Sequence, residues 1–168
     1  MSEEKILQAL QDPEVLTQKL TQLLSGELTL GQLAGLEFEQ LEAMYAMAVD
    51  KYDSGAVDSA KEVLSALCFF DMNNARNWYA LAQCHQAQKN YQQALETYSQ
   101  AAMRDIENAS IWYQMAVCHF QKGEIYEALS VIDEAQDNIK SDTQENLICE
   151  IKNLKALVTK KLKQTGVA

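Results

Sequence analysis

The pattern of hydrophobic and polar positions repeats every 34 residues in the middle of the chain. Residues 75–108 and 109–142 align without a gap and share aromatic, small and Cys-His positions: Ala75/Ala109, Trp78/Trp112, Tyr79/Tyr113, Ala82/Ala116, Cys84/Cys118, His85/His119, Ala94/Ala128, Leu95/Leu129 and Ala101/Ala135. Residues 41–74 form a weaker copy, with corresponding places taken by Met44, Tyr45, Met47, Ala48, Gly55, Ala60 and Leu64. A period of this length is typical of stacked supersecondary units.

Each unit predicts two antiparallel helices joined by a tight turn. Small residues such as Ala82 and Ala94 let the helix backbones approach closely. Gly and Asn suit the left-handed geometry that ends a helix, which predicts turns at 53–55, 88–90 and 122–124. The unit length and its aromatic and small positions match the tetratricopeptide repeat. The sequence therefore predicts an all-α solenoid of three repeats, 41–74, 75–108 and 109–142, within a single domain, 1–168.

Helical segments flank the predicted repeats. In the N-terminal segment, 1–40, Asp12 can cap a helix that begins at Pro13 and stops at Gly26. A second short segment opens at Thr29 and carries Leu33, Leu36 and Phe38. At the other end, Ser141 or Asp142 can cap a helix over 143–163. Its apolar stripe suits the end cap that a repeat array needs: Leu147, Ile151, Leu154 and Val158.

The helix after Pro13 has an apolar stripe of its own, formed by Val15, Leu16, Leu20 and Leu23. It lies outside the repeats and is separated from them by glycines. Two outcomes stay open at this point: the stripe packs on its own solenoid, or it mediates dimerisation.

Composition narrows the class of protein. One proline and six glycines in 168 residues favour an all-α chain. No apolar run approaches the ~18–20 residues needed to cross a bilayer, and the first residues lack a secretory signal pattern. These features predict a cytoplasmic protein that does not insert into a membrane.

Charge is distributed unevenly along the chain. Residues 1–139 hold 21 acids and 8 bases, whereas residues 140–168 hold three acids and six lysines. An acidic body repels phosphate backbones, so no nucleic-acid partner is expected. The lysines are explained most simply as a favourable cationic end on the last helix; a specific anion-binding role is the alternative.

No catalytic set is visible, and no enzyme activity or cofactor is expected. The repeated dipeptides, Cys84-His85 and Cys118-His119, do not predict a metal site, because adjacent helical residues point about 100° apart and zinc sites use wider spacings. The four cysteines, Cys68, Cys84, Cys118 and Cys149, are dispersed and are interpreted as small core residues.

A stripe on the first helix of each repeat carries the candidate binding chemistry. Positions 5, 9 and 12 of the unit lie on one helix face. We call the residues there the groove stripe: Tyr45, Val49, Tyr52, Tyr79, Gln83, Gln86, Tyr113, Val117 and Phe120. Tetratricopeptide solenoids direct this stripe into a concave groove, and aromatic rings with amide groups suit an extended apolar peptide. The alternative is that these residues pack against the N-terminal segment or the last helix.

Over about residues 24–139 the chain resembles the class II chaperones of bacterial type III secretion. The resemblance rests on LSGELTL (24–30), LEAMYAMA (41–48), YDSG (52–55), ALCFFD (66–71), YQQA (91–94) and QKGE (121–124). It implies a non-enzymatic cytoplasmic chaperone, commonly dimeric through N-terminal helices, that keeps hydrophobic translocator proteins soluble before export. The implied cargo contact is a short extended segment in the concave groove, at positions that include Tyr45, Tyr52 and Tyr79. A general tetratricopeptide adaptor is the alternative function.

Overall fold

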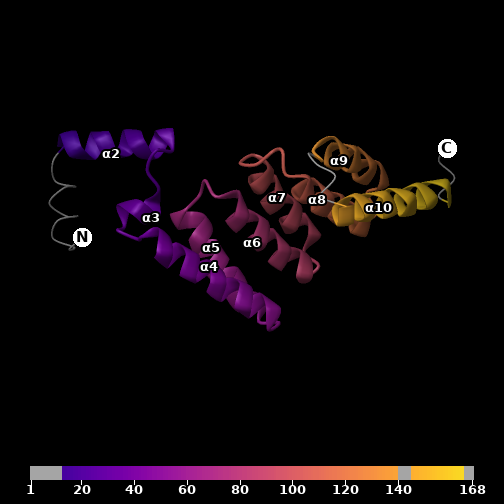
Figure 1. Ribbon diagram of the computed structural model, residues 1–168, viewed down its shortest axis with the longest axis horizontal. Coiled ribbons are helices and arrows are strands. Elements are labelled where there is room, and N and C mark those ends of the chain that lie inside the picture. Colours follow the sequence, from indigo (N-terminus) through magenta and orange to yellow (C-terminus); the bar gives the residue numbers. More distant parts are fainter. Residues whose placement is uncertain (1–12, 140–144, 165–168) are drawn as a thin grey trace.

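The computed structural model describes residues 13–139 and 145–164, and these contain helices and no β-strand. The repeats are three helix pairs that follow one another in a row (Figure 1): α4 (Phe38–Asp53) with α5 (Val57–Phe70), α6 (Ala75–Ala87) with α7 (Tyr91–Ala102), and α8 (Ala109–Lys122) with α9 (Ile125–Asp137). The all-α repeat prediction is confirmed. The first helix of the first repeat, α4, begins at Phe38, where Glu37 and Gln40 form a capping box.

The turns inside the repeats fall where the sequence predicted them. Gly55 and Gly123 both have φ 83°, the left-handed geometry in which glycine carries no steric penalty. In the middle turn the equivalent residue is Lys89, with φ 60°. Asn90, the asparagine of this predicted turn, has φ −82° and is the N-cap of α7.

Small residues and tryptophans pack the helices together at equivalent places in the last two repeats. Ala82 and Ala116 are fully buried. The Trp78 indole N–H donates to the Met72 carbonyl at 2.8 Å, and the Trp112 indole donates to the Ile106 carbonyl at 2.7 Å. Each ring therefore packs between helices while its one polar group bonds the loop that enters its repeat.

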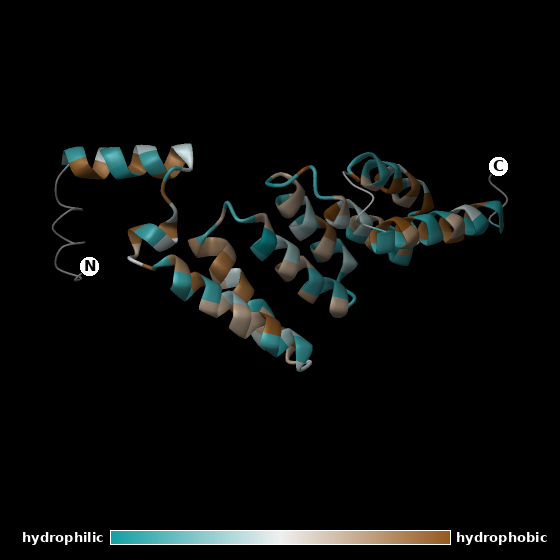
Figure 2. Ribbon diagram, in the orientation of Figure 1, coloured by the Kyte–Doolittle hydropathy of each residue, from teal (hydrophilic) through white to brown (hydrophobic). Residues whose placement is uncertain are grey.

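The N-terminal segment forms α2 (Pro13–Ser25) and the short α3 (Leu30–Leu33). Gly26, with φ +79°, ends α2 as predicted, whereas the predicted cap, Asp12, lies outside the described residues. Thr29 caps α3 through a capping box with Gln32. In Figure 1, α2 stands beside the solenoid rather than on it, and it has no buried residue. In Figure 2, hydrophobic and hydrophilic residues alternate along α2, as in an amphipathic helix.

The C-terminal helix α10 (Glu145–Gln164) packs against α9 and α8. Ile151, Leu154 and Val158 are buried there, which confirms the predicted end cap. The proposed N-caps of this helix, Ser141 and Asp142, lie outside the described residues. One prediction was wrong: Cys149 is exposed, because its place in the helical period turns it away from the buried stripe. The other three cysteines are buried, as expected.

Candidate functional site: a candidate peptide-binding groove

The first repeat contributes Tyr45, Val49 and Tyr52 from one face of α4. Both tyrosines are half-buried, and Val49 is exposed. The Arg76 guanidinium of α6 lies over the Tyr45 ring, 3.9 Å from its centroid, and it also forms a salt bridge with Glu42. Burial raises the pKa of Tyr45, and the positive charge of Arg76 partly opposes the rise. Tyr45 is therefore a neutral ring, held in place by a cation–π contact.

The second repeat adds Tyr79 from α6. Burial is the main cause that raises its pKa, and Glu150, Tyr45 and Tyr52 add to the rise. Arg76, which lies over the Tyr45 ring, lines the same hollow as Tyr79, and Tyr52 lines the neighbouring hollow. The structure thus brings together the three tyrosines that repeat periodicity placed on one face.

Beneath these rings, a hydrogen-bond network joins the second and third repeats. The Tyr98 side chain of α7 is fully buried, and its hydroxyl donates to Gln86 Oε1 at 2.6 Å. Gln86 Nε2 donates in turn to Gln114 Oε1 at 3.0 Å, and the Gln114 side chain bonds the Tyr79 hydroxyl. The Tyr79 and Tyr98 rings contact each other with centroids 5.6 Å apart. The network fixes both rings and satisfies a buried hydroxyl.

Two hollows lie in succession along this face of α6. One, of about 300 Å³, is lined by Tyr52, Gln83, Gln86, Ala87 and Gln114. The other, of about 390 Å³, is lined by Ala75, Arg76, Tyr79, Asp105, Asn108, Ser110 and Ile111. In the described residues the Gln83 amide forms no hydrogen bond, so both its donor and its acceptor are available in the first hollow. Together the hollows and the rings form a groove with apolar and polar walls.

In the third repeat the groove stripe meets α10. Tyr113, Val117 and Phe120 are half-buried and pack against the cluster that contains Ile151, Leu154 and Val158. The Lys161 ammonium lies 5.1 Å from the centroid of the Phe120 ring. For these three residues the alternative considered from the sequence, packing against the last helix, is realised at least in part.

Sequence reasoning missed two residues of this site. Gln114 links Gln86 to Tyr79, and the negative charge of Glu150 on α10 contributes to the raised pKa of Tyr79 and of Tyr113. A signal for Gln114 existed, because its repeat position holds alanine in the other copies, Ala46 and Ala80. No periodic signal marked Glu150, since it lies outside the repeats.

The repeated Cys-His dipeptides lie in different surroundings. Burial raises the pKa of the Cys118 thiol to about 12 and also raises that of Cys84. His119 Nδ1 lies 2.7 Å from Glu124 Oε2, whereas His85 Nδ1 is buried without a hydrogen-bond partner. Within residues 13–139 and 145–164, no three His, Cys, Asp or Glu side chains are grouped to hold a metal ion.

The comparisons with known proteins agree on one family. The tetratricopeptide repeat family model matches residues 85–144. The low calcium response locus protein H of Yersinia pestis is 34% identical over 71 residues, and the match spans 42% of this chain and 42% of that relative. No described helix is both long and apolar enough to cross a membrane.

Solved structures match over more of the chain. The type III secretion chaperone SycD of Yersinia enterocolitica, in complex with a peptide of the translocator YopD, is 31% identical. The match covers 74% of this chain and 96% of SycD, with a TM-score of 0.71. PcrH of Pseudomonas aeruginosa, in complex with the chaperone-binding region of PopD, is also 31% identical, covering 76% and 96% of the chains with a TM-score of 0.72. The chain therefore belongs to the family of class II type III secretion translocator chaperones.

Proposed function

We propose that this chain is a cytoplasmic bacterial chaperone that holds an extended segment of a hydrophobic translocator protein in its groove before export. The observation that carries the proposal is the set of three half-buried tyrosines, Tyr45, Tyr52 and Tyr79, beside two hollows on one face. Relatives of the same fold are bound to peptides of YopD and PopD. The chain acts by binding, and no catalytic step is part of the proposal.

The chemistry of the groove suits an extended apolar segment. Tyrosine rings give a large contact area at a low cost in side-chain entropy. An extended segment also exposes unpaired backbone N–H and C=O groups, and these need partners once they leave water. The Gln83 amide and the tyrosine hydroxyls offer such partners beside the rings. The groove therefore provides apolar contacts for side chains and hydrogen bonds for the backbone of the same segment.

Preorganisation supports binding at this face. The cation–π contact of Arg76 holds Tyr45, and the Gln114 hydrogen bond holds Tyr79. A ring that is already fixed loses little conformational entropy when the segment arrives. We propose that the first two repeats form the principal contact and that Tyr113, Val117 and Phe120 form the end of the groove beside α10.

Titration calorimetry with a synthetic peptide of the PopD chaperone-binding region tests the proposal. The full chain is expected to bind it, and Tyr45→Ala is expected to weaken binding by about 30-fold, the effect of losing an anchor worth ~2 kcal/mol. Tyr126→Ala is the matched control, because Tyr126 is an exposed tyrosine on α9 and lies outside the groove stripe. Normal binding by a folded Tyr45→Ala variant would place the peptide elsewhere.

We also propose that the chain forms a homodimer through α2, at Val15, Leu16, Leu20 and Leu23. In a single chain this stripe buries no residue, and Leu20 is 49% exposed. A dimer would remove the stripe from water, which is favourable by about 25 cal/mol per Å² of apolar surface. Deleting residues 1–35 should therefore leave a folded monomer. Sedimentation of the truncated protein as a dimer at micromolar concentration would contradict this assignment.

A further inference from the structure

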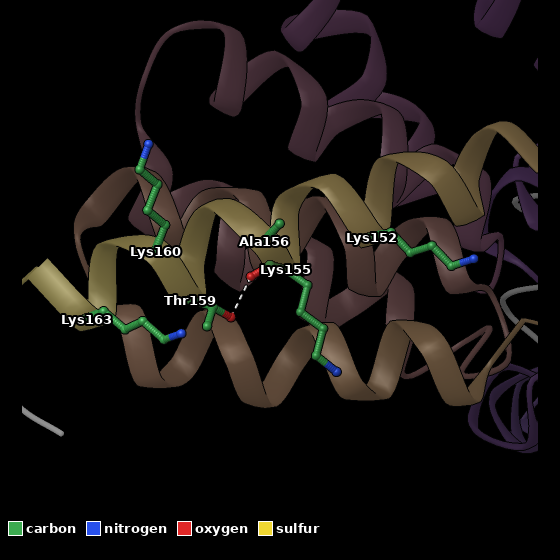
Figure 3. Close-up of a pocket in the computed structure, with 6 residues that line it drawn as sticks. All are labelled: Lys152, Lys155, Ala156, Thr159, Lys160 and Lys163. Carbon is green, nitrogen blue, oxygen red and sulfur yellow. Dashed lines mark hydrogen bonds between the residues drawn. The ribbon is translucent and has the colours of Figure 1, made fainter.

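The outward face of α10 carries a cluster of lysines that the proposed function does not use. Four lysines surround two small residues and border a hollow of about 420 Å³ (Figure 3): Lys152, Lys155, Lys160 and Lys163 around Ala156 and Thr159. Lys152, Lys160 and Lys163 are exposed on the flank of α10 beside its buried stripe, whereas Lys155 is half-buried against α9. We call this flank the lysine face; its three exposed lysines are open to a partner.

Most of this positive charge is not neutralised by the chain itself. Lys155 is held by α9, with its Nζ 2.8 Å from Asp133 Oδ1 and 2.7 Å from Gln136 Oε1. In the part of the chain that the structure describes, Lys152, Lys160 and Lys163 form no salt bridge. The whole chain holds 24 acids and 14 bases. Three unpaired lysines on one face are therefore a local exception in an acidic protein.

We infer that the lysine face of α10 binds a short acidic segment of a partner protein. Lysine ammonium groups recognise carboxylates as point charges and need no fixed geometry. The small side chains of Ala156 and Thr159 leave room between the lysine stems for carboxylate-bearing side chains. The Thr159 hydroxyl is already used, because it donates to the Lys155 carbonyl at 2.7 Å, so the recognition is carried by charge.

The charge of the rest of the chain favours a short partner over a long polyanion. At physiological ionic strength, charges act over about 8 Å. An acidic segment that covers only α10 stays within reach of the lysines. A nucleic acid or an anionic membrane would also approach residues 1–139, which hold 21 acids and 8 bases and would repel it.

The composition of α10 also favours an acidic protein segment over a nucleic acid or a membrane. It contains no aromatic residue on which a nucleic-acid base could stack. Its apolar residues Ile151, Leu154 and Val158 are buried in the solenoid, and Leu157, which is 55% exposed, is too small an apolar surface to insert into a lipid layer by itself. A carboxylate-rich protein segment requires neither of these features.

Fluorescence anisotropy of a labelled ten-residue peptide of alternating Glu and Ser tests the inference. The full chain should bind this peptide at low salt, more weakly at high salt, and should not bind the Gln-Ser analogue. The triple variant Lys152→Gln, Lys160→Gln and Lys163→Gln should weaken binding by about tenfold. A matched triple variant of lysines elsewhere, Lys19→Gln, Lys51→Gln and Lys89→Gln, should change it little.

Three outcomes would overturn the inference. In the first, the peptide fails to bind the full chain at low salt. In the second, the two triple variants weaken peptide binding equally. In the third, the peptide never binds, and the α10 variant loses binding to phosphatidylglycerol vesicles. Binding of the PopD peptide to the groove, measured on the same α10 variant, should be unchanged, so the result does not depend on whether the groove proposal holds.

Discussion

The second and third repeats have closely related sequences and yet present different surfaces. In the second repeat Tyr79 lines one hollow along α6, and Gln83, one turn further on, lines the next hollow and is available for bonding. In the third repeat the equivalent residues, Tyr113 and Val117, pack against a buried cluster that α8, α9 and α10 share. The difference comes from the neighbour: α6 is followed by another repeat, whereas α8 is followed by the end cap. The same repeat position can therefore line an open hollow in one unit and pack beside the end cap in the next.

Replacing the tryptophan of either repeat should lower the stability of the protein by a similar amount. Trp78→Ala and Trp112→Ala each remove a ring that packs between helices and a bond to the preceding loop. Each variant should lose about 3–5 kcal/mol of unfolding free energy, because a large cavity remains. Thermal and urea melts measure this loss. A much smaller loss for one of the two would mean that the repeats differ in their cores as well as on their surfaces.

Replacing the groove-stripe tyrosine should affect peptide affinity in the second repeat and stability in the third. Tyr79→Ala should weaken binding of the PopD peptide by about 30-fold, since it removes an anchor of ~2 kcal/mol. Tyr113→Ala should act mainly on stability, because its ring packs against the α10 cluster. Calorimetry and thermal melts on both variants separate the two effects. Equal losses of peptide affinity would show that the third repeat binds cargo as strongly as the second.

The contrast between the second and third repeats separates the features that the sequence could predict from those that it could not. Repeat periodicity predicted the helix pairs, the turns and the face that carries Tyr45 and Tyr79, because each depends on residues within one repeating unit. It left open whether Tyr113 would pack against the last helix, and it gave no sign that the charge of Glu150 would act on two tyrosines. Those contacts depend on the angle at which a non-repeating helix meets the array, and no period in the sequence encodes that angle.

Similar reasoning explains the error at Cys149 and the length of α4. Cys149 was assigned to the core from its residue type alone, although the stripe of α10 passes through Leu147 and Ile151 instead. The helix α4 begins at Phe38, before the 34-residue unit that the period places at Leu41, because the capping box at Glu37 starts the helix there. In both places local helix geometry overrides composition and period.

The buried tyrosine under the groove offers a finer test of the second repeat. Tyr98→Phe keeps the ring and its contact with Tyr79 but removes the hydroxyl that donates to Gln86. The variant should lose about 1–2 kcal/mol of stability, because the Gln86 carbonyl oxygen is left without its donor. Tyr91→Phe, on the same helix and with no hydrogen bond from its hydroxyl in the described residues, is the control. A loss of peptide affinity that exceeds the loss of stability would show that the network also orients Gln86 and Tyr79 for cargo.

The smallest expected effect is a difference in how the stability of the second and third repeats responds to pH, through His85 and Glu124. Burial is the main cause that lowers the pKa of His85 below its ordinary value of 6.5, with a smaller contribution from Lys61. The unfolded chain then binds more protons than the folded chain just below pH 6.5, so stability should fall as the pH decreases through that window. In the third repeat, hydrogen bonds from Lys122 and then His119 lower the pKa of Glu124. That stabilisation is present above the ordinary carboxyl range and is lost only as the pH falls through the lowered value.

Melts of the full chain at a series of pH values between 7.5 and 3 check this difference. Replacing His85 with Gln should flatten the fall just below pH 6.5, and Glu124→Gln should flatten only the fall in the acid range. The two variants act on equivalent turns of neighbouring repeats, so each serves as the control for the other. If His85→Gln leaves the response just below pH 6.5 unchanged, the buried imidazole is not its source, and the contrast between the two repeats is confined to the groove face.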